Sequence, residues 1–122
     1  FGRTIKAIKD FNIDLGKIKV VDLMGYKKFI KFMQDSKFII SDSGTAQEEP
    51  AILNIPVIVP RDFTERPESV SNNNSRLLPV DSDKKHKSIL EWALGSRDTS
   101  IDWLGDGNTS NTIVEILKEE LK

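Results

Sequence analysis

The 122-residue sequence contains no cysteine, one histidine and one tyrosine. Without cysteine the chain has neither a disulfide framework nor a thiolate metal site. No apolar run approaches the roughly 18 residues of a membrane-spanning helix, so we expect no membrane segment. Basic and acidic residues nearly balance, at 18 and 19, and this balance does not favour a nucleic-acid-binding surface.

The remaining composition, 38% hydrophobic and 30% charged residues, is typical of a soluble globular protein. A chain of 122 residues is long enough for one hydrophobic core, so we expect a single domain over residues 1–122. No signal peptide is visible, and we expect a cytoplasmic protein. Because the sequence starts on Phe1 rather than methionine, we also expect a fragment or a processed product.

Short apolar runs alternate with helical patterns along the chain. The predicted strands cover residues 18–23, 38–41 and 56–59, with a fourth candidate at 77–80. The predicted helices cover residues 1–11, 26–36, 85–94 and 108–122, and one more that ends near Asn54, a suitable left-handed cap residue. Residues 69–75 have the composition of a loop. The alternation predicts an α/β fold with a parallel sheet of about four strands flanked by helices.

A polar turn, SDSG, lies between the predicted strand 38–41 and the helix that follows it. Ser43 and Thr45 have the spacing of capping residues, and Pro50 must kink the helix or lie in its first turn. Free N–H groups at a helix N-terminus attract anions, and Gly44 lets a ligand approach the backbone closely. An ordinary capped helix after a core strand fits these residues equally well, so the turn alone leaves both interpretations open.

A second polar motif, RDFTERPE, follows the predicted strand 56–59, and a GDG triplet occurs at 105–107. Taken together, SDSGTAQEE, LNIPVIVPRDFTERPE and GDG resemble the C-terminal domain of non-hydrolysing UDP-N-acetylglucosamine 2-epimerases. The resemblance covers roughly residue 20 to the C-terminus. Two linked motifs of this length are far more specific than a lone glycine-rich turn.

This resemblance implies a Rossmann-like domain that is the C-terminal, UDP-binding half of a GT-B architecture, with the N-terminal half absent from the chain. It implies a UDP-sugar ligand and, in the complete protein, an isomerase that interconverts UDP-GlcNAc and UDP-ManNAc. UDP is eliminated to leave a glycal and is then added back to the other face. The product would serve the synthesis of surface polysaccharide precursors. It implies a homodimer, and neither a metal nor a cofactor. The catalytic acid and base groups would lie outside this chain, so we expect no catalytic residue here and an inactive 122-residue chain.

The UDP-binding residues implied by the resemblance are Phe29, Ser43, Gly44, Thr45, Glu49 and Arg66. Ser43 and Gly44 match the turn that contacts the diphosphate, and Arg66 matches a phosphate-contacting arginine. Glu49 matches the carboxylate that accepts the ribose hydroxyls, and Phe29 falls at the aromatic position near the uracil. Thr45 stands where the common pattern has a second glycine, which leaves the exact sugar open.

Other interpretations of the same residues remain open. The chain could instead be the nucleotide-binding half of a GT-B glycosyltransferase, against which the TERPE segment argues, or a non-catalytic nucleotide-sugar-binding fragment. An alternative role for Arg66 is to pair with Glu65, Glu68 or Asp62 in its own loop.

Several further side chains have chemistry of their own. Glu48 and Glu49 are adjacent on a helix and point about 100° apart, so only one of them is expected to reach a given ligand. His86 lies in a charged stretch and is expected at the surface. Trp92 and Trp103 are expected in the core or at a domain interface.

Overall fold

A parallel sheet is the centre of the computed structural model, which describes residues 2–79, 81 and 83–121. Among these residues the sheet has three strands, in the order β1 (Ile39–Ile40), β2 (Val57–Val59) and β3 (Ser75–Leu77). The helices are α1 (Gly2–Asp10), α2 (Tyr26–Gln34), α3 (Thr45–Ile52), α4 (Pro67–Ser71), α5 (Asp83–Leu94) and α6 (Thr109–Glu120). A short 3₁₀ helix spans Asp102–Leu104. The predicted α/β fold is confirmed, with three strands in place of about four.

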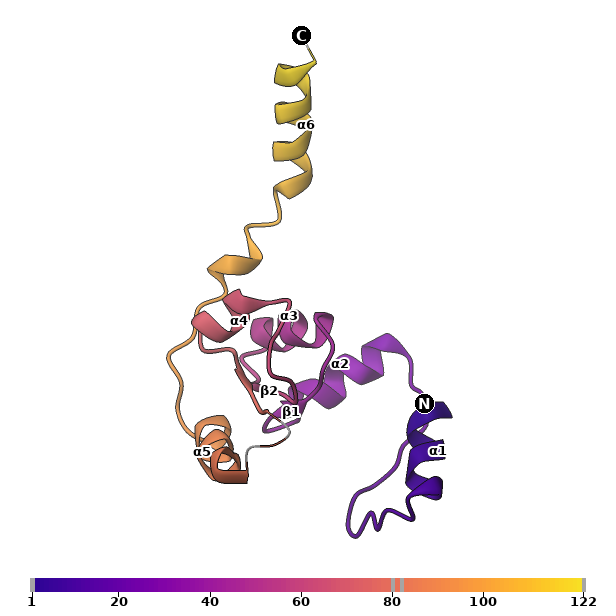
Figure 1. Ribbon diagram of the computed structural model, residues 1–122. Helices are drawn as coiled ribbons and strands as arrows, with labels where there is room; N and C mark the ends of the chain where they lie inside the picture. Colours follow the sequence, from indigo (N-terminus) through magenta and orange to yellow (C-terminus); the bar gives the residue numbers. More distant parts are fainter. Residues whose placement is uncertain (1, 80, 82, 122) are drawn as a thin grey trace.

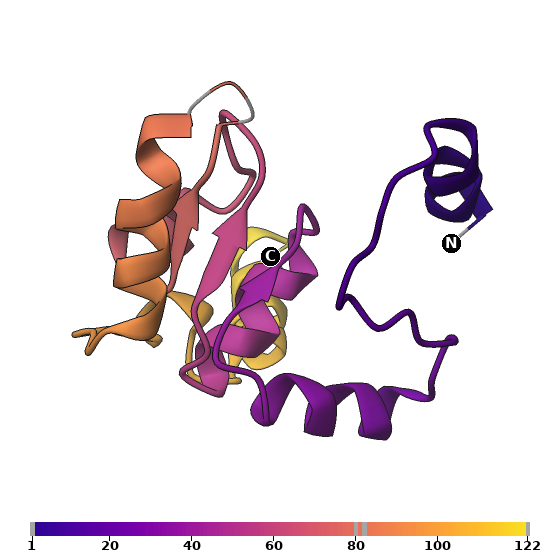
Figure 2. The ribbon, with the colours of Figure 1, turned by 90° about the horizontal axis from the view of Figure 1, so that it is seen from below.

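The hydrophobic core lies around the central strand β2, whose three residues are all buried. Ile58 packs against Ile89 and Ala93 of α5. Because side chains alternate along a strand, Val57 and Val59 face the opposite side of the sheet. Figure 2 shows α5 on one side of the sheet and α3 on the other. Both faces of β2 are therefore covered, which explains its uninterrupted apolar sequence.

Helix α3 begins directly after the SDSG turn and ends as predicted near Asn54. Asn54 has a φ of 55°, in the left-handed region. The N–H of Ile55 donates to the carbonyl of Pro50 at 2.9 Å, and that of Asn54 donates to Ala51 at 3.0 Å. These two bonds form a Schellman motif that satisfies the last carbonyls of the helix. Pro50 lies in the second turn of α3, not in the first.

The predicted strand at 18–23 is wrong. This segment is irregular and pairs with no strand among the described residues. Its apolar side chains are largely exposed: Ile18 by 70%, Val20 by 62% and Leu23 by 82%. A β-branched run stabilises a strand through packing against neighbouring strands, and no described strand lies beside this one.

Residues 69–75 were predicted to be a loop, and this too is wrong in part. Helix α4 continues to Ser71, and β3 already starts at Ser75. The strand predicted at 77–80 is therefore shifted toward the N-terminus. The first residue of the predicted helix 1–11 and the last residues of the predicted strand 77–80 and helix 108–122 lie outside the described residues. They are Phe1, Val80 and Lys122.

The two tryptophans bond to the turn that precedes β3. The Trp92 indole donates to Asn73 Oδ1 at 2.7 Å, and the Trp103 indole donates to Asn74 Oδ1 at 2.9 Å. Trp92 also packs against the core cluster, which confirms its predicted structural role.

The first and last helices extend away from this body (Figure 1). Neither α1 nor α6 has a buried residue, and apolar side chains such as Ile113 and Ile116 of α6 are half exposed. Every helix of the described residues is too short or too polar to span a lipid bilayer.

Candidate functional site

The two polar motifs meet at one edge of the sheet. Strands β1 and β2 run parallel, with Ile40 opposite Ile58, so SDSG and RDFTERPE both leave the sheet at its carboxyl edge. Arg61 Nη2 donates to Asp42 Oδ2 at 3.0 Å and joins the two segments. This hydrogen bond and the charge of Arg61 lower the pKa of Asp42 below its ordinary value. Carboxyl edges of parallel strands are where open α/β sheets bind ligands.

A cavity of about 240 Å³ opens between the two motifs. Its lining residues are Asp42, Ser43, Gly44, Gln47, Val59, Arg61, Thr64 and Glu65. Most of these side chains are polar, and the N-terminus of α3 adjoins the cavity through Gly44. The first N–H groups of a helix have no partners within the helix, so they are available to an anion here.

Arg66 folds back over this turn. A Cβ atom built on Gly44 would lie 3.6 Å from Arg66 Cζ and 3.7 Å from Nη2, so the guanidinium covers the glycine. Arg66 Nε donates to Glu48 Oε1, and Nη1 donates to the Glu65 carbonyl at 3.1 Å. Among the described residues no acceptor lies within hydrogen-bond distance of Nη2. The guanidinium is thus held at two nitrogens, and its third is available to a ligand.

This arrangement corrects the alternative role proposed for Arg66. Its carboxylate partner is Glu48 of α3, not Glu65, Glu68 or Asp62. The hydrogen bond that Arg66 donates to Glu48 is the main reason that the pKa of Arg66 is raised. Arg66 therefore stays fully charged at the cavity.

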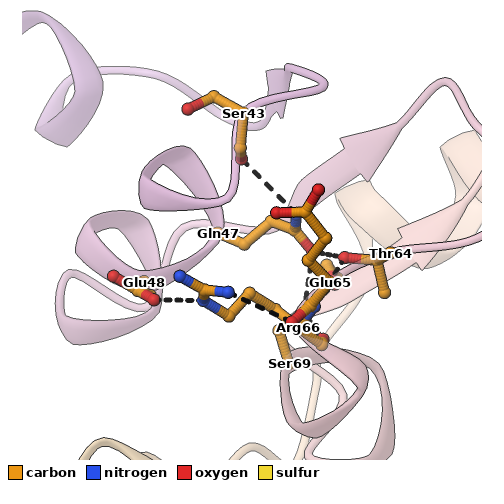
Figure 3. Close-up of polar contacts among 8 residues, drawn as sticks. Ser43, Gln47, Glu48, Thr64, Glu65, Arg66 and Ser69 are labelled. Atoms are coloured by element: carbon orange, nitrogen blue, oxygen red, sulfur yellow. Dashed lines mark hydrogen bonds and ion pairs between the residues drawn. The ribbon is translucent and has the colours of Figure 1, made fainter.

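Gln47 connects the two motifs beneath the cavity, as Figure 3 shows. Its Oε1 accepts hydrogen bonds from Thr64 Oγ1 at 2.7 Å and from Ser69 Oγ at 3.0 Å. Its Nε2 donates to the Ser43 carbonyl at 3.4 Å. Gln47 is only 2% exposed, so a lost partner would leave a buried amide unsatisfied. These bonds fix the TERPE loop against the SDSG turn.

Glu48 and Glu49 point to different partners, which confirms their predicted divergence. Glu48 pairs with Arg66, whereas Glu49 Oε1 accepts a hydrogen bond from Tyr26 Oη at 2.8 Å. Tyr26 is the first residue of α2, so this bond joins α2 to α3. A cavity of about 250 Å³ lies beside it, lined by Tyr26, Ile30, Glu49, Ile52 and Leu53.

Phe29 lines a third cavity, one helical turn beyond Tyr26. This cavity, of about 450 Å³, is lined mainly by apolar side chains: Val21, Asp22, Leu23, Met24, Tyr26 and Phe29. Phe29 is 44% exposed, so its ring is open to a ligand. A flat apolar base fits such a surface better than a charged group does.

Ser43 and Thr45 do not cap α3 as predicted. Gly44 occupies the N-cap position, and no side chain of the described residues caps this helix. Ser43 and Thr45 are exposed, and Ser43 lines the cavity whereas Thr45 does not. Their hydroxyls are therefore not engaged in capping, and Ser43 is the one placed to meet a ligand.

His86 is exposed on α5, as predicted. Within the described residues, no three histidines or carboxylates come together as a metal site would require.

Comparison with known proteins agrees with this geometry. The sequence profile of the UDP-N-acetylglucosamine 2-epimerases matches residues 2–118. The chain belongs to this epimerase family. A curated UDP-N-acetylglucosamine 2-epimerase of Methanocaldococcus jannaschii is 35% identical over 120 residues, which cover 94% of this chain and 32% of the relative. One from Methanococcus maripaludis is 34% identical and covers 98% of this chain and 34% of the relative.

Solved epimerases have the same fold over this region. A crystal structure of the Methanocaldococcus jannaschii epimerase in complex with UDP-GlcNAc and UDP matches with a TM-score of 0.81 at 34% identity. It covers 98% of this chain and 34% of that protein. The Neisseria meningitidis epimerase bound to UDP-GlcNAc matches with a TM-score of 0.64 at 30% identity. These epimerases have a GT-B type fold, and this chain spans about a third of their length.

Sequence reasoning missed three side chains of this epimerase-family site. Tyr26 belongs only to the predicted helix 26–36, and Gln47 only to the SDSGTAQEE motif, so neither is among the residues predicted to bind UDP. Glu48 was set beside Glu49 without a partner. Each of them acts through a contact between segments 17 to 23 residues apart. Only the polar character of Gln47, at a position that proves buried, hints at such a role.

Proposed function

We propose that this chain is the C-terminal, UDP-sugar-binding half of a UDP-N-acetylglucosamine 2-epimerase. The complete protein would interconvert UDP-N-acetylglucosamine and UDP-N-acetylmannosamine. The observation that carries the proposal is the position of Arg66 over Gly44, at the N-terminus of α3. The fixed positive charge of Arg66 and the N–H groups at the N-terminus of α3 can therefore bind the same anion. Family membership supports the same ligand.

Each part of a UDP molecule has a complementary group along this edge. The diphosphate would lie between the Ser43–Gly44 turn and Arg66, where N–H, hydroxyl and guanidinium donors converge. The Glu49 carboxylate would accept the ribose hydroxyls. The uracil would enter the apolar cavity beside Phe29. Thr45, exposed at the start of α3, would flank the diphosphate.

The proposed reaction removes the C2 proton and the UDP group of the sugar to leave a glycal. UDP then adds back to C1, and a proton is returned to the opposite face of C2. Negative charge grows on the diphosphate as the bond to the sugar breaks. Arg66 and the positive end of α3 would stabilise this charge without reorganising, because both are already fixed. The proton transfers at the sugar would use groups from other parts of the complete protein.

The test is removal of Arg66 in the complete protein. Arg66→Ala should weaken UDP binding by about 10- to 150-fold, since a charge-assisted phosphate contact contributes roughly 1.5–3 kcal/mol. Arg66→Lys should recover only part of this, because a single ammonium cannot keep the contacts to Glu48 and the Glu65 carbonyl while it also reaches the phosphate. Isothermal calorimetry with UDP and with uridine measures both ligands. Uridine, which has no phosphate, should bind both variants almost as well as it binds the unaltered protein.

The matched control is Lys87→Ala, which removes an exposed cation from α5. It should leave both affinities unchanged. An equal loss of affinity for UDP and uridine in Arg66→Ala would show that Arg66 serves only the loop and would overturn the proposed phosphate contact.

We also propose that the complete protein acts in the cytoplasm as a homodimer. A nucleotide diphosphate carries several charges and does not cross a bilayer unaided, so its enzyme belongs where nucleotides are made. The family resemblance supports the dimer. Light scattering of the complete protein would give twice the mass of one chain, and a monomer mass would contradict this.

A further inference from the structure

The hydroxyl of Tyr26 is a polar group near the proposed nucleotide site to which the proposed function gives no role. Tyr26 is the only tyrosine in the sequence. Its Oη donates to Glu49 Oε1 at 2.8 Å across 23 residues of sequence. This bond links α2 to α3.

Tyr26 borders two of the cavities at once. On one side it lines the apolar cavity with Met24 and Phe29. On the other it lines the smaller cavity with Glu49 and Ile30. In a nucleoside the base and the ribose are joined by a single bond, so their binding groups must also be neighbours. The Tyr26 ring stands between the proposed base cavity and the proposed ribose carboxylate.

The contact limits the motion of Glu49. A glutamate side chain has several rotatable bonds and loses freedom when a ligand fixes it, which weakens binding. Tyrosine is stiff, with two side-chain torsions, and is a suitable anchor. With Oε1 held by Tyr26, the carboxylate keeps lone pairs on both oxygens for hydroxyl donors. The hydrogen bond to Glu49 also raises the pKa of Tyr26, so its hydroxyl stays a donor at neutral pH.

We propose that Tyr26 is a positioning residue that pre-orients Glu49 toward the ribose hydroxyls and thereby makes the site selective for ribonucleotides over deoxyribonucleotides. This proposal rests on the proposed UDP site. It assigns to Tyr26 a role in binding and none in the proton transfers.

The decisive variant is Tyr26→Phe in the complete protein, which removes one oxygen and keeps the ring. Its affinity for UDP should fall about 10-fold, because a hydrogen bond to a charged group is lost and Glu49 is released. Its affinity for 2′,3′-dideoxy-UDP should change less than about twofold, because that ligand offers Glu49 no hydroxyl. Calorimetry with both ligands measures the two values. In turnover, KM should rise while kcat stays near its original value, as uniform binding requires.

A double-mutant cycle tests whether Tyr26 acts through Glu49. On a Glu49→Ala background, Tyr26→Phe should cause no further loss of UDP affinity. The matched control is Lys31→Met, which removes an exposed hydrogen bond of 2.9 Å to Asp35 on the same helix and should change neither affinity.

The outcomes separate this proposal from the one it rests on. An equal loss for UDP and dideoxy-UDP in Tyr26→Phe, or a full loss that persists without Glu49, would show a purely structural bond and overturn the positioning role. If the unaltered protein binds neither UDP nor dideoxy-UDP, the proposed function itself fails and the positioning role fails with it.

Discussion

Gly44 has the backbone angles of an ordinary helical residue, with φ −59° and ψ −49°. Conformational freedom is therefore not what makes glycine suitable here, since any residue adopts these angles. What distinguishes Gly44 is the space above it. A Cβ would make ordinary van der Waals contact with the Arg66 guanidinium, at 3.6 Å, and would fill the gap between that cation and the backbone.

Gly44→Ala should therefore separate folding from binding. We expect the free energy of unfolding to change by less than about 1 kcal/mol, because the methyl fits without a clash. UDP affinity should fall about 10-fold or more, since a methyl group holds the phosphate away from the backbone N–H groups. Thermal unfolding and calorimetry on the complete protein measure the two effects. Gly2→Ala, at a glycine with nothing within 4 Å of its Cβ position, is the control for both. An unchanged affinity for UDP would show that no anion approaches the backbone at Gly44.

Single residues are predictable from the sequence where the physics is local. The left-handed angle of Asn54 follows from its type and its place after a helix. The partner of Arg66 cannot be predicted in this way. Its own loop offers carboxylates at Glu65 and Glu68, but in the fold the carboxylate that pairs with Arg66 is that of Glu48. Which carboxylate pairs with Arg66 depends on how α3 packs against the TERPE loop, and a local sequence pattern does not predict that packing.

At the scale of elements, Gln47 holds four segments together. Its side chain forms hydrogen bonds to the SDSG turn, the TERPE loop and Ser69 of α4. The Ser69 hydroxyl is in turn hydrogen-bonded to that of Ser75 in β3, with 2.6 Å between the two oxygens. Each hydroxyl has one proton, so a consistent order is Ser75 to Ser69 to Gln47 Oε1. These groups are buried together, and satisfied buried networks of this kind fix one arrangement of the surrounding elements.

Gln47→Leu should loosen this edge while the core remains. The substitution keeps the approximate volume but removes the acceptor of two hydrogen bonds, at a cost of about 1–3 kcal/mol. Amide hydrogen exchange of the complete protein should become about 5- to 150-fold faster in the TERPE loop and α4, and stay unchanged in β2. Gln34→Leu, at an exposed position of α2, should leave the exchange rates within about twofold. Equal acceleration in β2 and α4 would show a global effect and contradict a local role for Gln47.

Elements were predictable where burial and periodicity agree. The strands at 39–40 and 57–59 follow from uninterrupted apolar runs. The sheet buries all of Val57–Val59, whereas Ile39 is half-buried and Ile40 is exposed. The segment at 69–75 was misread because Ser69 and Ser75 are polar by type yet buried, and each satisfies the other. The run at 18–23 has strand composition, but its pairing depends on neighbours that composition does not specify.

At the scale of the whole molecule, the described residues supply the groups of the proposed leaving-group site more completely than those of a site for proton transfer. The carboxylates of Asp42 and Glu65 line the cavity, and Glu48 lies beside Arg66. Asp42 is paired with Arg61, which lowers its pKa, and Glu48 is paired with Arg66. A carboxylate whose pKa is lowered by a cation is a weak base, so Asp42 does not suit proton abstraction near neutral pH. Glu48 is engaged by the Arg66 guanidinium. Glu65 is the exposed carboxylate that remains at the cavity.

Epimerisation by elimination and re-addition takes a proton from one face of a carbon and returns one to the other. It therefore requires groups on both sides of the sugar ring, each within hydrogen-bond reach of about 2.6–3.2 Å. One carboxylate on one edge does not meet this requirement.

We expect the purified 122-residue chain to form no UDP-N-acetylmannosamine from UDP-N-acetylglucosamine, whereas the complete protein should do so. Proton NMR of the reaction mixture distinguishes the two sugars. An Arg66→Ala chain, purified in parallel from the same host, reports contaminating host enzyme. Epimer formed by the unaltered chain above that background would overturn the expectation and make Glu65 the first candidate for the missing base.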